Sequence, residues 1–215
     1  MNKKCAVFLV VMVCALGLMS QASAARLGNY VALKGGIYSP SASFTLKNLP
    51  NSDSFDANTK AGFAGEIAFG RYVLPTLALE LGAGYFKGKG TFTPKPLYDL
   101  DFNVIPVIVS AKALIPVGPV DPYGEAGIGA YFTKAKVIQN QDTFNFSGTT
   151  TFGFHAGLGL NVNVSQNAFL GVEGKYVTAS PSIGDQKIKL NSTDYALNGF
   201  KLNGFITTVV LGFSF

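Results

Sequence analysis

The sequence has few of the residues that usually carry redox, metal or nucleophilic chemistry. It contains two cysteines and one histidine in 215 residues. Both cysteines, Cys5 and Cys14, lie near the start of the chain, in a segment that we predict is removed. A disulfide framework needs paired cysteines in the folded protein, and a zinc site needs several cysteines or histidines. We therefore expect neither, and no other metal or cofactor.

The first 25 residues show the three parts of a secretory signal peptide. These are a positive start at Lys3 and Lys4, an apolar run of 13 residues over Ala6–Leu18, and small residues at 22–25. The pattern predicts cleavage after Ala24 or Ala25. The apolar run is short for a membrane helix, which takes about 20 residues. We therefore assign 1–25 to the signal peptide and 26–215 to one folded domain.

Charge is scarce, and long apolar runs are missing. Without Lys3 and Lys4, 15 basic residues face 12 acidic ones, and no basic cluster occurs, which argues against nucleic acid as a partner. After residue 25 no stretch has 18 consecutive apolar residues, so no membrane helix is predicted. Glycine and phenylalanine are abundant instead, with 25 and 18 copies, and both favour strands over helices.

Eight segments alternate between large apolar residues and small or polar ones, which is the period of a β-strand. They cover 27–38, 61–73, 76–86, 100–115, 122–132, 151–164, 168–178 and 203–215. In the last segment one parity holds Phe205, Thr207, Val209, Leu211, Phe213 and Phe215. The opposite parity holds Gly204, Thr208, Gly212 and Ser214, interrupted by Ile206 and Val210.

The connections between these segments alternate in length. The short ones are at 74–75, 116–121 and 165–167, and the long polar ones are at 39–60, 87–99, 133–150 and 179–199. Short turns at one end and long loops at the other are typical of outer membrane barrels. We therefore predict an all-β fold, an eight-stranded antiparallel up-and-down transmembrane β-barrel that follows a cleaved signal peptide.

Four stretches carry a resemblance to a known family. They are YVALKGGIYSP at 30–40, NVIPVIVSAKALIP at 103–116, PYGEAGIGAYF at 122–132 and the terminal Phe215. The mature chain resembles the small outer membrane proteins of the OmpA transmembrane, OmpX/Ail and opacity-protein type. The resemblance implies an integral protein of the outer membrane of a Gram-negative bacterium. It also implies that Leu211, Phe213 and Phe215 act as a signal for the outer membrane assembly machinery.

Ionisable residues occur at the parity opposite to the apolar one, which faces the lumen in a membrane barrel. They are Lys34, Glu66, Glu80, Lys112, Glu125, His155, Glu173 and Lys175. In a regular hairpin Lys112 and Glu125 face each other, so we predict a Glu80–Lys112–Glu125 cluster near the short-turn end. We also expect Lys175 to lie within reach of His155. The network is either a polar plug or a gated path for ions or protons.

Two further residues lead to specific expectations. Pro106 removes a hydrogen bond from any sheet that contains it, so a bulge or local break is predicted there. Ser110 shares the lumen parity with the single histidine, His155, but lies on a distant strand. We therefore expect no Ser–His catalytic pair and predict that the protein is not an enzyme.

Three functions remain open from the sequence. The first is a barrel with a structural or surface-exposed role, adhesin-like or in envelope integrity, with a plugged lumen. The second is a narrow porin-like channel for ions or small solutes. The third is a soluble lipocalin-like carrier in the periplasm, which would need an apolar interior. Expected partners are outer membrane lipid and lipopolysaccharide, and a surface ligand bound through the long loops.

Overall fold

The computed structural model describes most of the predicted mature domain. The described ranges are 28–41, 44–48, 54–92, 98–139, 142–146, 150–180, 187–190, 193–198 and 201–215. The predicted signal peptide lies outside them. Among the described residues all regular structure is strand, and no helix has the length and apolar character needed to cross a membrane.

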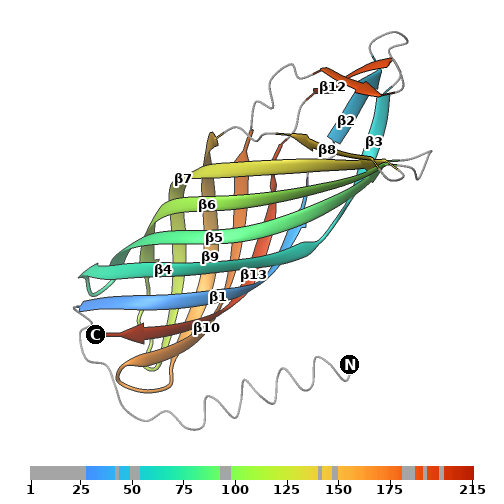
Figure 1. The fold of residues 1–215 in the computed structure, drawn as a ribbon. Coiled ribbons are helices and arrows are strands. Elements are labelled where there is room, and N and C mark those ends of the chain that lie inside the picture. Colours follow the sequence, from blue (N-terminus) through green and yellow to red (C-terminus); the bar gives the residue numbers. More distant parts are fainter. Residues whose placement is uncertain are drawn as a thin grey trace, which may run out of the picture.

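Eight long strands form the wall of a closed barrel (Figure 1). They are β1 (Gly28–Pro40), β4 (Gly62–Leu74), β5 (Leu77–Phe92), β6 (Tyr98–Leu114), β7 (Val120–Gln139), β9 (Thr150–Asn163), β10 (Ala168–Ala179) and β13 (Gly204–Ser214). Each pairs antiparallel with the next, and β13 pairs with β1, with Leu211 opposite Leu33. At this seam Asn29 and Phe215 exchange two backbone hydrogen bonds of 2.9 Å. The predicted eight-stranded antiparallel barrel is confirmed, and the cleaved signal peptide stays a prediction.

Five shorter strands lie beyond the long-loop end of the barrel (Figure 1). They are β2 (Phe44–Asn48), β3 (Ser54–Lys60), β8 (Asp142–Phe146), β11 (Lys187–Leu190) and β12 (Thr193–Asn198). The order β11-β12-β2-β3-β5 joins the first and last long connections into one sheet. The long polar connections predicted at 39–60, 133–150 and 179–199 are present, and they contain short strands that the sequence analysis did not predict. Outside the membrane neither face of a strand meets hydrocarbon, so the apolar alternation that marks membrane strands is lost.

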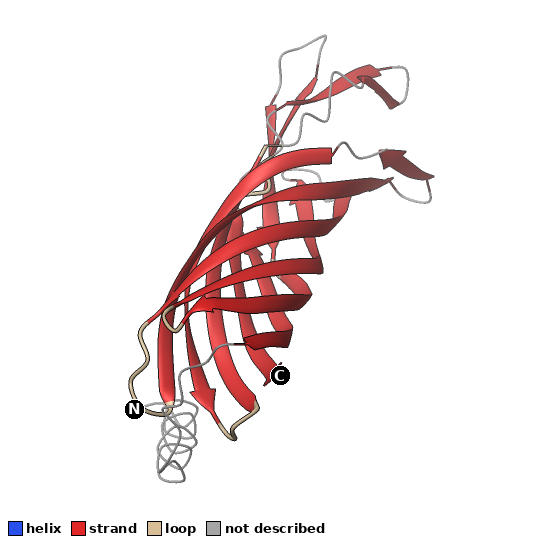
Figure 2. Ribbon diagram, turned by 90° about the vertical axis from the view of Figure 1, so that its left-hand side faces the viewer, coloured by secondary structure: helices blue, strands red, loops and turns tan. Residues whose placement is uncertain are grey.

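The short connections lie at the opposite end, as Figure 2 shows in tan. They are the turn at Pro75 and Thr76, the link from Ile115 to Pro119, and the turn over 164–167. In the last turn Ser165 Oγ accepts hydrogen bonds from the backbone N–H groups of Asn167 and Ala168. The two ends of the barrel therefore differ: one carries tight turns, and the other carries the five short strands.

The two faces of the wall have opposite character. Large apolar side chains point outward and are exposed, among them Leu33, Ile67, Leu81, Val109, Ile128, Leu158, Val172 and Val209. Exposed aromatic side chains lie toward the two rims, with Phe63, Tyr85, Phe132, Phe152 and Phe205 toward the long-loop end and Phe69, Phe213 and Phe215 toward the short-turn end. Such aromatic girdles mark the two interfaces of a membrane. The Tyr176 ring is half-buried because it packs against Phe205, with ring centroids 4.9 Å apart.

The β5–β6 ladder is interrupted beside Pro106. Pairing runs from Leu77↔Ala113 to Ala83↔Val107 and resumes at Phe86↔Val104 with the register unchanged. Gly84 and Tyr85 therefore have no ladder partner in β6. Proline has no N–H to donate, which accounts for the interruption. Of the two predicted outcomes, the break occurs and the bulge does not.

The outward face allows a test of membrane depth with one type of substitution. Val109→Lys places a charge in the middle of the apolar band, whereas Val73→Lys places it at the short-turn rim. We expect the first to lower the free energy of unfolding by about 2–4 kcal/mol and the second by about 0–1 kcal/mol. Urea titrations in phospholipid vesicles, followed by circular dichroism, measure both. Equal losses would show that the outward face does not contact hydrocarbon.

Candidate functional site

Charged side chains from six of the eight wall strands meet in the middle of the barrel. They are Lys34 on β1, Glu66 on β4, Glu80 on β5, Lys112 on β6, Glu125 on β7, and Glu173 and Lys175 on β10. We call this set the ion cluster. Their backbone positions follow from strand parity, because alternate residues of each wall strand point to the lumen.

Each lysine of the ion cluster contacts three carboxylates. Lys34 Nζ lies 2.7 Å from Glu80, 2.8 Å from Glu66 and 3.1 Å from Glu173. The ammonium is completely shielded from solvent. A buried charge is tolerated only when it is paired and hydrogen-bonded, so Lys34 depends on all three partners.

The other two lysines extend the ion cluster around the lumen. Lys112 Nζ lies 2.9 Å from Glu80, 3.2 Å from Glu173 and 3.4 Å from Glu125. Lys175 Nζ lies 3.0 Å from Glu66, 3.2 Å from Glu173 and 3.5 Å from Glu125. The structure thus places Glu80, Lys112 and Glu125 together. Glu173, which contacts all three lysines, is the centre of the network.

Tyrosines that the sequence analysis did not select complete the ion cluster. The Tyr30 hydroxyl donates to Glu80 and the Tyr123 hydroxyl donates to Glu173, both at 2.8 Å. The Lys112 ammonium also lies 4.6 Å from the centre of the Tyr123 ring. Both tyrosines have the lumen parity of their strands, and that parity was the available signal. Their hydroxyl groups donate to carboxylate oxygens, which can accept more hydrogen bonds than the three lysines alone provide.

Aromatic layers enclose the ion cluster on both sides. Toward the short turns, Tyr30 packs against Tyr72 and Phe169, with ring centroids 5.1 and 5.7 Å apart. Toward the long loops, Tyr38 packs against Phe86 and Phe102, at 4.5 and 6.2 Å. Tyr30 and Tyr38 each lie four residues from Lys34 on β1, roughly 13 Å along the strand, one on the short-turn side and one on the long-loop side. Charged and aromatic side chains thus follow one another inside the barrel from the short-turn side to the long-loop side.

Glycines make room for the inward rings. A Cβ atom added to Gly70 would collide with the Tyr30 ring, and one added to Gly212 would collide with the Phe169 ring. Gly159 lies in the same way against Tyr123. Gly82 and Gly157 lie instead against the side chains of Glu66 and Glu125. A small residue opposite a large one lets a narrow barrel interior pack fully.

His155 forms a hydrogen bond with Ser110 and none with Lys175 among the described residues. Its Nε2 atom lies 2.8 Å from Ser110 Oγ, and both side chains are buried. The expectation that Ser110 is too distant is wrong, because β6 and β9 both flank β7 and the inward side chains reach across Gly127. Lys175 points instead to carboxylates. The Ser110–His155 pair is enclosed at 1% and 3% exposure, so no substrate-sized molecule reaches it.

The ion cluster does not resemble a metal centre. Among the described residues no group of three or more His, Cys, Asp or Glu side chains is arranged to hold a metal ion. Lysine ammoniums lie between the carboxylates at the positions where a cation would bind. The arrangement can hold the wall strands together and block the axis, and it offers no open coordination site.

Comparison with known proteins identifies relatives of the whole barrel. The sequence profile of the family described as "Outer membrane protein beta-barrel domain" matches residues 6–213. A Rickettsia conorii protein provisionally named as an adhesin, RC1281, is 28% identical over 178 residues, covering 72% of this chain and 69% of that protein. The profile match covers every strand of the barrel wall.

Two solved structures share the architecture. The outer membrane protein OprG from Pseudomonas aeruginosa aligns with a TM-score of 0.63 at 14% identity, covering 91% of this chain and 99% of that chain. Neisserial surface protein A aligns with a TM-score of 0.50 at 18% identity, covering 87% of this chain and 97% of that chain. At these identities the similarity is one of fold.

Removal of one lysine tests the ion cluster. Lys34→Met leaves three buried carboxylates without their shared cation, and we expect the free energy of unfolding to fall by about 3–5 kcal/mol. The control is Lys89→Met, since Lys89 is exposed and lies 3.9 Å from Asp101. That change should cost less than about 1 kcal/mol. Urea unfolding in detergent, read by circular dichroism, compares them, and similar midpoints would contradict a structural role for the ion cluster.

Proposed function

The chain belongs to the outer membrane protein β-barrel domain family, and we propose that it serves as a non-conducting barrel that holds its long extensions at the cell surface. The observation that carries this proposal is the packing of charged and aromatic side chains inside the barrel. Nine ion pairs join the ion cluster across the barrel, with aromatic layers on both sides. A role that depends on the outside of the barrel fits such an interior better than transport does.

The interior also argues against a carrier. A lipocalin-like protein would need an apolar cavity and a polar outer surface. Here the charges lie inside and the large exposed side chains between the two girdles are apolar. This inverted arrangement is the one that a lipid environment favours.

The surface role is supported by the extensions and by one relative. β2, β3, β11 and β12 form a sheet beyond the membrane band, and β7 with β8 forms a second projection. A relative that covers most of this chain is provisionally named as an adhesin. An adhesin-like role or a role in envelope integrity therefore remains the proposal, and the surface ligand is expected to bind these extensions.

Two further partners belong to the proposal. Exposed Lys87, Lys89 and Lys134 lie near the long-loop end, where anionic lipopolysaccharide would be the neighbouring lipid. At the other end, the side chains of Leu211, Phe213 and Phe215 project outward from the closing strand, where the assembly machinery could reach them. The assembly signal stays a prediction that rests on the family resemblance.

Electrical recording tests the non-conducting proposal directly. We expect the purified barrel in a planar bilayer to show no steady single-channel steps, because ion pairs and rings occupy the axis. Insertion is checked in the same preparation by the mobility difference between boiled and unboiled samples on a gel. Reproducible steps from inserted protein would instead support the narrow porin-like channel.

Single cysteines test which end faces the cell exterior. The predicted mature chain has no cysteine, so a new one is a unique label site. Ser180 and Gln166 are both exposed, at the long-loop and short-turn ends respectively. On intact cells, a membrane-impermeant maleimide should label Ser180→Cys and should label Gln166→Cys only after the outer membrane is permeabilised. The reverse pattern would overturn the proposed surface presentation.

A further inference from the structure

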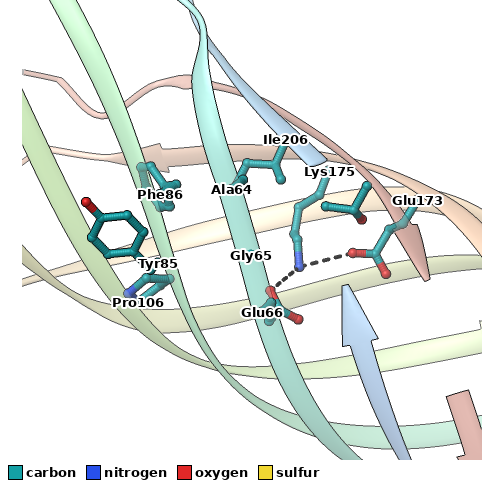
Figure 3. A pocket seen from close by; sticks show the side chains of 10 residues that line it. Ala64, Gly65, Glu66, Tyr85, Phe86, Pro106, Glu173, Lys175 and Ile206 are labelled. Carbon is teal, nitrogen blue, oxygen red and sulfur yellow. Dashed lines mark hydrogen bonds and ion pairs between the residues drawn. The ribbon is translucent and has the colours of Figure 1, made fainter. Parts of the chain in front are cut away.

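A small cavity lies beside the break in the β5–β6 ladder. Its volume is about 10 Å³, which is about the minimum that holds one water molecule. Figure 3 shows Glu66, Lys175 and Glu173 pointing toward one another at its edge, with Tyr85 and Pro106 on another side. The inward residues belong to the lumen, whereas Tyr85 belongs to the outer face. The cavity therefore extends from the ion cluster into the wall itself.

Two buried oxygens at this cavity have unused hydrogen-bonding capacity. Thr208 Oγ1 is buried and has no hydrogen-bond partner among the described residues. Glu66 Oε1 lies 2.8 Å from Lys34 Nζ as an ion pair, but its angles are outside hydrogen-bond geometry. A carboxylate oxygen has two lone pairs, so Oε1 can accept further donors. Buried polar groups of this kind are usually satisfied by ordered water.

Glu66 is also the least enclosed member of the ion cluster. Its side chain is 10% exposed, whereas those of Lys34, Glu80 and Glu173 are 0–1% exposed. Its cross-strand neighbour on β5 is Gly84, which has no side chain to cover the carboxylate.

The break lies at the level where the membrane changes from apolar to polar. Along the outer face of β5, Leu81 and Ala83 are followed by Tyr85 and then by the exposed Lys87. The Tyr85 hydroxyl donates to Asn103 Oδ1 at 2.8 Å, which joins β5 to β6 just where the backbone ladder is missing. Interfacial tyrosines mark the headgroup region, where water is available.

We propose that the cavity binds one water molecule that accepts from Thr208 Oγ1 and donates to Glu66 Oε1, and that this water exchanges with the membrane interface through the break beside Pro106. The Tyr85–Asn103 hydrogen bond covers the opening on the outside. The ion cluster is thus hydrated from the side, and protons reach Glu66 without a channel along the barrel axis.

Water fits this position better than other small ligands. A metal or alkali cation would be repelled by Lys34 and Lys175, whose ammoniums lie 2.8 and 3.0 Å from the two oxygens of Glu66. An anion would be repelled by Glu66 and Glu173, which line the same space. A neutral molecule that both donates and accepts is the remaining class, and the volume limits it to the size of water.

Substitution at Thr208 tests the binding site. Thr208→Val keeps the shape of the side chain and removes its hydroxyl, Thr208→Ser keeps the hydroxyl, and Thr207→Val makes the same change on the outward face of β13. The readout is magnetisation transfer from water to the Ala64 methyl group by NMR in detergent micelles, since Ala64 lines the cavity. Unboiled gel mobility shows that each variant is folded.

We expect a water signal at Ala64 in the wild type, in Thr208→Ser and in Thr207→Val, and a loss of most of it in Thr208→Val. No signal in the folded wild type, or an equal signal in folded Thr208→Val, would overturn the bound water. If Thr208→Val does not fold, the wild type and Thr208→Ser still test the bound water, because the absence of the Ala64 signal in either folded protein would overturn it.

Hydrogen exchange tests the route. At least one backbone amide of Gly84, Tyr85 or Ile105 should exchange faster than those of Leu81 and Phe86, which lie in intact parts of the ladder. Tyr85→Phe removes the outer hydrogen bond and should raise the fast rate several-fold. Tyr176→Phe, a girdle tyrosine on β10, is the control and should leave that rate unchanged. Uniformly slow exchange across β5, or no response to Tyr85→Phe, would overturn the lateral route.

Discussion

Closure of the sheet is the constraint on which this structure depends. In hydrocarbon a backbone N–H or C=O has no water to bond, so a sheet that crosses a membrane cannot keep a free edge. The pairing of β1 with β13 removes that edge along eleven residue pairs. Once the ring is closed, alternate side chains must face either lipid or an enclosed lumen. The apolar outer band and the buried charges are two results of this single condition.

Two kinds of packing occupy the enclosed lumen. Charges neutralise one another in the middle, where Glu173 is shared by all three lysines. Rings lie on the short-turn and long-loop sides of the charges, and several of them lie over a glycine of a neighbouring strand, as Tyr30 lies over Gly70. The exception is the wall beside Pro106, where a proline and a glycine face each other and neither side chain closes the gap.

The sequence predicted the barrel well because its signals are repeated in every strand. The alternation and the parity of Lys34 and Glu80 follow from a period of two, which is independent of tertiary detail, and the alternating loop lengths are a second repeated signal. The Glu80–Lys112–Glu125 cluster could be predicted because the pairing register of neighbouring strands alone places these residues side by side. The Ser110–His155 contact and the hydroxyl donors Tyr30 and Tyr123 could not be found in this way, because they depend on side-chain length across a curved wall. The extensions at the long-loop end were missed because strands outside lipid have no apolar parity.

The position of Lys34 has a consequence for how the protein is completed. It lies on the first strand of the chain, yet one of its carboxylate partners, Glu173, lies on the second-last strand of the wall. These groups become neighbours only when the two ends of the sheet come together around the lumen. An unfinished, open sheet would carry unmatched charges, whereas the finished ring carries matched ones. The charges are therefore neutralised in the same step that pairs the two edge strands. This makes the last step of assembly cooperative and disfavours barrels in which a strand is missing or misplaced.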